Sequence, residues 1–233
     1  MLTESTVFKL FTPVIDLVFP PLCGGCRRVL ITGEQGICLH CRGGLPVTPY
    51  FHSYHNPITH SLLGRVRFRH ATAYLNFAKD GIVQNMMHSL KYRGNRKLGI
   101  ELGRMAGSKW KRGPAVLQPD LVLGVPISSK KKRSRGYNQA EMIARGVAEE
   151  LQVPYSSDAL VRSGNKGSQT KLGRYARWRN VSEAFVGLRY LGPRHILLVD
   201  DTFTTGSTME ACGQVLWKLG IRDLSILAIA YAK

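Results

Sequence analysis

Two adjacent carboxylates, Asp200 and Asp201, follow a short apolar run and precede a loop rich in hydroxyl groups. The run 196–199 has the length and composition of a buried strand, and apolar residues with helical spacing follow Thr208. Carboxylates accept hydrogen bonds from neighbouring sugar hydroxyls, while free amides at a helix N-terminus attract a phosphate. The order of strand, acid pair, loop and helix therefore predicts a pocket for a sugar phosphate, with Asp200 and Asp201 as its catalytic pair.

The loop after the acid pair supplies the donors expected for the phosphate. Gly206 permits close approach of the backbone to a ligand, and the neighbouring hydroxyls add donors to those of the amides. The alternative is an ordinary helix cap, which needs only one such residue. The predicted phosphosugar-binding residues are Thr204, Thr205, Gly206, Ser207 and Thr208.

Four of the five cysteines form two Cys-x-x-Cys pairs near the N-terminus. Two such pairs complete a tetrahedral site of four thiolates, which is closed and therefore typical of structural zinc. The predicted ligands are Cys23, Cys26, Cys38 and Cys41. Reduced dithiols and a redox pair are the alternatives. The pattern also leaves open whether His40, His52 or His55 contact the metal.

A basic segment follows a predicted buried strand at 121–125 and carries five cations within six positions. Such a segment at a strand end can neutralise pyrophosphate or a nucleic-acid backbone. We expect a basic loop here, and the alternative is a solvated run of charge. Its cations are Lys130, Lys131, Lys132, Arg133 and Arg135. Nearby Tyr137 is expected either to stack on a base or to pack on the sheet.

A second basic segment, 163–182, interleaves arginines with aromatic residues and is predicted to be a loop. This composition suits a lid over a bound phosphosugar, or base stacking and phosphate contacts with single-stranded nucleic acid. The alternative is a surface loop whose aromatic residues fold back into the core. The candidate residues are Arg174, Tyr175, Arg177, Trp178 and Arg179, with Lys91–Arg93 as a secondary addition to the same surface.

The composition is that of a globular protein with an unusual charge. Of 233 residues, 44% are hydrophobic, while 33 Lys and Arg against 15 Asp and Glu give a net charge of +18. This excess predicts a polyanionic partner, and nucleic acid is the first choice. The apolar stretch 7–19 is too short and too polar for a stable membrane span. We expect a cytoplasmic protein, with contact at the inner face of the membrane left open.

Elements alternate along the chain in the manner of an α/β fold with a parallel sheet. The pattern predicts strands at 73–78, 121–125, 196–199 and 224–231, and helices at 82–90, 98–110, 140–151 and after the hydroxyl-rich loop. Asn138 is the predicted cap of the third helix, with Glu141 placed for a capping box. Segment 46–70 is expected to be a linker or an irregular cover. We divide the chain into residues 1–60, with an N-terminal helix, the zinc module and a linker, and residues 61–233.

The stretch from Val199 to Thr208 resembles the phosphoribosyl-pyrophosphate signature of the type I phosphoribosyltransferases. Together with the cysteine pairs, Leu-Lys-Tyr-Arg-Gly at 90–94, Arg-Gly-Tyr-Asn-Gln-Ala at 135–140 and Gln-Thr…Arg…Asn at 169–180, it resembles the ComF family of competence-associated proteins. This resemblance implies a small zinc ribbon joined to a type I phosphoribosyltransferase-like domain. In the transferases the acid pair holds the ribose hydroxyls and the following loop holds the 5′-phosphate.

The resemblance also implies a role in handling incoming single-stranded DNA during natural transformation, with proteins of the DNA-uptake machinery as partners. The expected ligands are structural zinc and, in the pocket, phosphoribosyl pyrophosphate with Mg²⁺. Three functions stay open at this point: a competence factor that holds single-stranded DNA, a phosphoribosyltransferase with an unknown acceptor, and a non-enzymatic sensor of a phosphoribosyl ligand.

Overall fold

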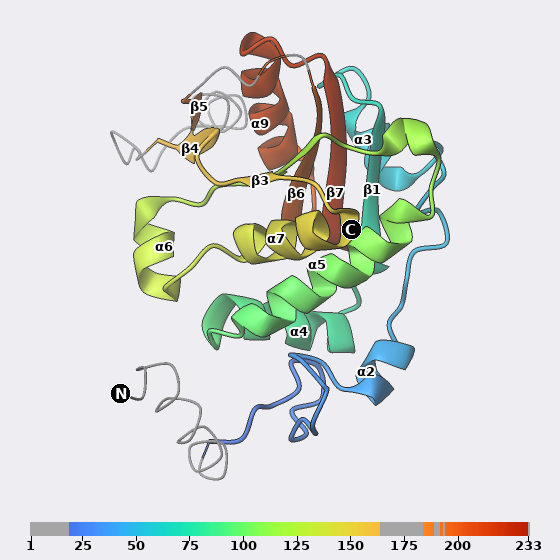
Figure 1. Cartoon of the computed structure of the whole chain (residues 1–233), viewed down its shortest axis with the longest axis vertical. Coiled ribbons are helices and arrows are strands. Elements are labelled where there is room, and N and C mark those ends of the chain that lie inside the picture. Colours follow the sequence, from blue (N-terminus) through green and yellow to red (C-terminus); the bar gives the residue numbers. More distant parts are fainter. Residues whose placement is uncertain (1–18, 164–183, 189–191, 193, 233) are drawn as a thin grey trace, which may run out of the picture.

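The computed structural model describes residues 19–163, 184–188, 192 and 194–232 (Figure 1). The predicted N-terminal helix and residues 174–179 of the arginine-rich segment lie outside these ranges. The described helices are α2 (Leu39–Gly43), α3 (Pro57–Leu62), α4 (Ile82–Tyr92), α5 (Arg96–Lys111), α6 (Ser129–Arg135), α7 (Gln139–Leu151), α9 (Ser207–Lys218) and the short 3-10 helix η1 (Ala115–Leu117). The described strands are β1 (His70–Asn76), β2 (Leu121–Gly124), β3 (Tyr155–Ser156), β4 (Leu160–Arg162), β5 (Phe185–Gly187), β6 (His195–Phe203) and β7 (Asp223–Tyr231).

Five strands form one parallel sheet in the order β1-β7-β6-β2-β3. The long central pair β6–β7 brings Asp200 beside Ala228, and Val199 pairs with Gly124 of β2 on the other side. Strands β4 and β5 form a separate antiparallel pair. The predicted α/β architecture with a parallel sheet is therefore confirmed.

Helices cover both faces of the sheet, and the alternation of side chains along β6 divides the core between them (Figure 1). Leu197 and Val199 belong to the cluster that contains α4, α5 and α7. Ile196 and Leu198 belong to the cluster that contains α3 and α9. All four side chains are fully buried, so residues 196–199 of β6 form a continuous apolar run, as expected for a central parallel strand.

The expectation of a basic loop after β2 is wrong, because residues 129–135 form helix α6. Ser128 caps its N-terminus and Gly136 ends it with a left-handed φ of +77°. Lys and Arg favour helices, and the apolar periodicity that reveals a helix in sequence is absent from a helix with no buried residue. The cations are consequently held on a short rigid element.

Segment 46–70, expected to be a linker or an irregular cover, contains the helix α3. The side chain of Asn56 accepts hydrogen bonds from the amides of Ile58 and Thr59, both at 2.9 Å, and its Nδ2 donates to the Ala71 carbonyl of β1. Ile58 and Leu62 are fully buried against the sheet. This segment is therefore part of the apolar core that also contains residues of α9.

Helix α7 begins as predicted, since the Asn138 side chain accepts from the Ala140 amide at 3.1 Å. The predicted capping box does not form, because Glu141 accepts a hydrogen bond from Arg145. Helices α5 and α7 cross closely at Gly103 and Gly146. A Cβ atom added at Gly146 would lie 2.0 Å from the Ile100 carbonyl oxygen, so this crossing requires glycine.

The cysteine module packs on the N-terminal ends of α4 and α5. Gly36, with φ +69°, lies so close to the Leu98 backbone that an added Cβ would be 2.4 Å from it. Asn85 donates to the Gly25 carbonyl at 3.0 Å, and buried cysteines share one apolar cluster with Leu98. The module and the sheet domain thus have a common core. No helix in the described part of the chain is long and apolar enough to cross a membrane.

Candidate functional site

A cavity of about 260 Å³ opens where β2 and β6 end. The carboxyl ends of parallel strands are where open α/β sheets bind ligands. It is bordered by residues from four separate regions of the chain, 91, 125–140, 162 and 200–208, so the fold rather than local sequence assembles it. The lining residues are Lys91, Val125, Pro126, Ile127, Lys131, Arg135, Asn138, Gln139, Ala140, Arg162, Asp200, Asp201, Thr202, Thr204 and Thr208. We call this space the phosphate cavity.

The acid pair lies at the end of β6, on the wall of the phosphate cavity. Asp200 Oδ1 accepts the Asp201 amide at 2.8 Å, and Asp201 Oδ2 forms an ion pair with Lys91 Nζ at 3.2 Å. Burial, and then the neighbouring charge of Asp201, raise the pKa of Asp200 well above its usual range. The fold thus disfavours the charged form of Asp200 relative to an exposed aspartate.

The hydroxyl-rich bend leads into α9, and Gly206 is the residue before the helix. Gly206 has φ +76°, and an added Cβ would meet Leu62 and Phe203 at 2.8 Å. No side chain caps α9 here, whereas asparagines cap α3, α5 and α7. The first-turn amides of Ser207 and Thr208 have no acceptor within the helix. The bend therefore keeps amides available for an anion.

The predicted loop residues occupy different positions around this bend. Thr204 and Thr208 line the phosphate cavity. Thr205 and Ser207 do not, and their hydroxyls bond each other at 3.0 Å. Gly206 is buried against Leu62 and Phe203 and contributes only backbone.

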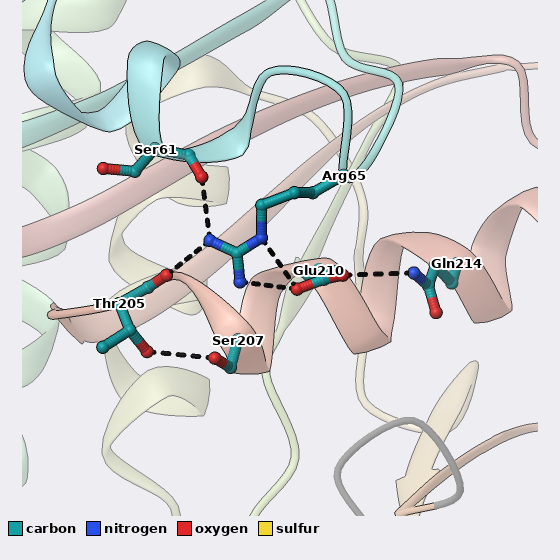
Figure 2. A network of polar contacts seen from close by, with 6 residues as sticks. All are labelled: Ser61, Arg65, Thr205, Ser207, Glu210 and Gln214. Carbon is teal, nitrogen blue, oxygen red and sulfur yellow. Dashed lines mark hydrogen bonds and ion pairs between the residues drawn. The ribbon is translucent and has the colours of Figure 1, made fainter. Parts of the chain in front are cut away.

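An ion pair between half-buried Arg65 and buried Glu210 connects the bend to the loop after α3, as Figure 2 shows. Arg65 donates through Nε and Nη2 to Glu210 Oε2, at 3.0 and 2.5 Å, and through Nη1 to the carbonyls of Thr205 and Ser61 at 2.7 and 2.8 Å. Glu210 is 5% exposed and lies in the first turn of α9. The fork of a single guanidinium thereby fixes the helix start relative to the loop after α3. The sequence analysis missed Arg65, because the two residues are 145 positions apart.

Two cations of α6 reach the phosphate cavity. Lys131 and Arg135 line it, whereas Lys130, Lys132 and Arg133 are exposed outside its lining. Lys132 lies 3.9 Å from Glu141. Arg135 donates to the neutral amide of Gln139 at 2.9 Å. The cavity therefore has two cations of α6 and the acid pair in the same lining.

Tyr137 is buried rather than exposed for stacking, and its contacts are with α4 and α5. It is 4% exposed, and its hydroxyl donates to the Leu90 carbonyl at the end of α4. Gln139 donates to the same carbonyl at 3.3 Å. These bonds tie the end of α4, and with it Lys91, to the start of α7.

Several residues of the cavity wall were absent from the sequence-based site or had only a secondary place in it. Lys91 had such a place; in the structure it contacts the acid pair. Asn138 was recognised as a cap, and its Nδ2 also donates to the Val125 carbonyl at 2.9 Å, which fixes the chain after β2. Arg162 enters from β4. Of these residues, only Asn138 could have been found from a local sequence signal, as the cap of a predicted helix.

The four predicted metal ligands come together. The sulfur atoms of Cys23, Cys26, Cys38 and Cys41 all lie within 4.8 Å of one another, and no histidine joins this group in the described ranges. The Cys38 amide donates to Cys23 Sγ at 3.3 Å, and the Cys41 amide donates to Cys38 Sγ at 3.4 Å. Burial raises the pKa of the Cys23 thiol, but hydrogen bonds from the amides of Cys26, Cys38 and Gly25 outweigh burial and lower this pKa to about 6. The donor set fits a structural zinc ion.

Comparisons with known proteins find relatives that cover most of this chain. No protein-family model matches the chain. It is similar to the DNA utilization protein YhgH of Shigella flexneri, with 27% identity over 225 residues that cover 90% of this chain and 96% of the relative. Competence protein F of Haemophilus influenzae is 30% identical over 125 residues, which cover 52% of this chain and 55% of that protein. These relatives support the resemblance to competence proteins noted from the motifs.

Solved structures of phosphoribosyl enzymes show weaker likeness. The allosteric regulatory enzyme of purine biosynthesis aligns with 16% identity and a TM-score of 0.42, over 60% of this chain and 29% of the enzyme chain. Purine phosphoribosyltransferase from Pyrococcus horikoshii aligns with 17% identity and a TM-score of 0.37, over 57% of this chain and 73% of that one. Scores of this size do not assign a ligand, which has to be inferred from the chain's own residues.

Proposed function

We propose that this chain, a member of the ComF family, binds a 5-phosphorylated ribose in the phosphate cavity and holds single-stranded DNA on its basic surface. One observation carries the first part. The acid pair, the uncapped start of α9 and the two cations of α6 border the same 260 Å³ space, although they come from distant segments. A phosphorylated pentose has hydroxyls and phosphate oxygens to match each of them.

Each group has one task in this proposal. Asp200 and Asp201 receive the ribose hydroxyls, and the bend at 204–208 donates to the 5′-phosphate. Lys131 and Arg135 neutralise a diphosphate on the other side of the sugar, as in phosphoribosyl pyrophosphate. Mg²⁺ accompanies such a diphosphate because oxygen atoms are its preferred ligands. If turnover takes place, the same cations balance the charge of the leaving pyrophosphate.

The DNA part of the proposal has its own support. The relatives carry the names DNA utilization protein and competence protein. The chain has a net charge of +18, and the exposed face of α6 carries Lys130, Lys131 and Arg133 without an ion pair in the described ranges. Residues 174–179 remain candidates for the same role.

Calorimetric titration with ribose 5-phosphate, ribose and inorganic phosphate separately tests the first part. Ribose 5-phosphate engages both the acid pair and the bend, so we expect it to bind at least tenfold more tightly than either fragment, since about 1.4 kcal/mol corresponds to a factor of ten. Equal affinity for inorganic phosphate would exclude the acid pair from the site. Pyrophosphate release with a panel of nucleobases then distinguishes a transferase from a sensor.

A further inference from the structure

A second cavity, also of about 260 Å³, adjoins the phosphate cavity between the end of α4 and α6. It is lined by Lys91, Tyr92, Gly94, Lys131, Ser134 and Arg135. Three of these six, Lys91, Lys131 and Arg135, also line the phosphate cavity. The two spaces are therefore neighbours that share a wall of cations. We call the second space the tyrosine groove.

The tyrosine groove has no carboxylate among its lining residues, and two of its three cations form no ion pair with any residue that the structure describes. Lys91 is paired with Asp201, but Lys131 has no ion pair in the described ranges. Among the described residues, Arg135 donates to the neutral side chain of Gln139 and forms no ion pair. A groove with uncompensated cations favours a phosphate group.

The same groove presents an aromatic ring. Tyr92 is 67% exposed, an unusual state for a large aromatic side chain at the end of a helix. The Arg135 guanidinium lies 5.7 Å from its ring centroid, and the His88 ring lies 4.9 Å away on the same helix. An exposed aromatic ring beside cations is the arrangement that stacks a base and contacts the adjoining phosphate.

Another cleft of the chain lacks this combination. Trp217 borders a cavity of about 450 Å³ beside the loop 64–67. Two guanidinium groups, of Arg67 and Arg222, already lie 4.6 and 3.8 Å from the Trp217 ring centroid. Tyr92 has one cation at a longer distance and remains mostly exposed, so we favour the tyrosine groove.

We propose that the tyrosine groove is a subsite for single-stranded DNA, in which an unpaired base stacks on Tyr92 and a neighbouring phosphate contacts Lys131 and Arg135. This inference rests on the proposed function in one respect: that phosphoribosyl pyrophosphate is the ligand of the neighbouring phosphate cavity. Because the two cavities share these cations, a ligand whose diphosphate occupies Lys131 and Arg135 competes with the strand. Ribose 5-phosphate lacks the diphosphate and leaves the cations free.

Fluorescence anisotropy of a short labelled oligothymidylate with the full-length, zinc-loaded protein tests the subsite. Tyr92→Leu is expected to weaken binding about tenfold, and Tyr92→Phe to retain it, since stacking needs the ring and not the hydroxyl. Tyr54→Leu is the matched control, because Tyr54 is also an exposed tyrosine but lies outside both cavities. Unchanged binding by Tyr92→Leu, or tighter binding of duplex than of single-stranded DNA, would overturn the proposal.

The salt dependence tests the phosphate contact. Lys131→Gln should reduce the slope of log affinity against log salt by about 0.7, the change expected for one lost phosphate contact on a single strand. Lys111→Gln, a charge change on the exposed end of α5 outside both cavities, should leave the slope unchanged. Equal slopes for the wild-type protein and the Lys131 variant would contradict the contact.

Competition tests the shared wall. Phosphoribosyl pyrophosphate with Mg²⁺ should raise the apparent dissociation constant of the oligonucleotide in proportion to its concentration, while ribose 5-phosphate has a much smaller effect. If phosphoribosyl pyrophosphate stabilises the protein thermally but leaves DNA affinity unchanged, the shared wall is refuted. If it does not stabilise the protein at all, the proposed function fails, and the Tyr92 variants still decide the tyrosine groove.

Discussion

Arg65 and Glu210 join the loop after α3 to the first turn of α9, with Nη2 and Oε2 2.5 Å apart. The same guanidinium bonds the Thr205 carbonyl at 2.7 Å, so a single residue sets the position of the bend that faces the phosphate cavity (Figure 2). Neither residue lines that cavity. Their effect on a ligand is therefore one of positioning.

Arg65→Met is expected to destabilise the protein by about 1–3 kcal/mol, because it removes the guanidinium that forms two hydrogen bonds with the buried Glu210 carboxylate. It should also weaken ribose 5-phosphate binding, since the bend loses its support. Urea unfolding and calorimetry measure the two effects. Adding Glu210→Leu should restore part of the stability, whereas a double variant less stable by the full sum of the single losses would show that the pair is not coupled.

Asp200→Asn should make the protein more stable at neutral pH while it weakens ligand binding. The folded-state pKa of Asp200 is raised, so the folded chain binds a proton that the unfolded chain releases above about pH 3.9. The free energy of unfolding therefore falls as pH rises from about 3.9 towards the folded-state pKa of Asp200. Above the folded-state pKa, the protein bears the whole free-energy cost of burying the charged carboxylate. Asparagine removes this cost and keeps an oxygen for the Asp201 amide. A melting temperature lower than that of the wild-type protein at pH 7.5 would contradict the prediction.

Buried histidines predict a loss of stability in mild acid. Burial lowers the pKa of His70 and of His195, and His195 Nδ1 lies 2.9 Å from the Gln118 carbonyl, to which it must donate. In the unfolded chain these rings bind a proton below about pH 6.5, whereas in the folded chain they bind it only at a lower pH. Stability is thus complete above about pH 6.5 and declines as pH falls towards the lower folded-state values. Urea midpoints at pH 7.5 and 5.5 check this, and His195→Gln should reduce the difference.

The crossing of α5 and α7 should not tolerate a methyl group. Gly146→Ala places a Cβ 2.0 Å from the Ile100 carbonyl oxygen, and Gly103→Ala places one 2.1 Å from that of Ile143. Overpacking of this kind typically costs about 1–3 kcal/mol. Gly43→Ala, where nothing lies within 4 Å, is the matched control. Wild-type stability of the Gly146 variant in urea would show that the helices can separate without cost.

Metal removal is expected to loosen more than the cysteine module. Cys23, Cys38 and Cys41 share one buried cluster with Leu98 and Met86, so loss of zinc exposes the ends of α4 and α5. A strong chelator should lower the melting temperature and raise amide exchange in residues 82–98. Cys41→Ser should show the same change without chelator and no further response to it. An unaltered melting curve would refute a stabilising metal.

The sequence was sufficient for the parts of the fold that apolar patterns and short motifs encode. Short stretches of sequence contain the signals for three features: the run 196–199 for strand β6, Asn138 for the start of α7, and the paired cysteines for the metal site. Helix α6 was missed because it has no buried residue and therefore no apolar periodicity. The element α3 was obscured by surrounding turn residues, although its cap Asn56 and N1 proline are ordinary start signals.

The candidate site was only partly accessible to sequence reasoning. The acid pair and the bend are contiguous, so a motif contains them. Lys91, Arg65 and Arg162 join them from positions 38 to 140 residues away in sequence, and no local pattern marks such pairings. Which cations of α6 reach the cavity depends on the helical turn, since Lys131 and Arg135 share a face that Lys130 and Arg133 do not.

The most direct test of the phosphosugar site compares thermal unfolding with and without phosphoribosyl pyrophosphate and Mg²⁺ in the wild-type protein and in the Asp200→Asn, Asp201→Asn double variant. At a hundredfold excess over the dissociation constant, a ligand of the folded state contributes about 2.7 kcal/mol, which corresponds to a rise in melting temperature of several degrees. We predict this rise for the wild-type protein and its loss in the double variant. An equal rise in both would place the ligand away from the acid pair and contradict the account.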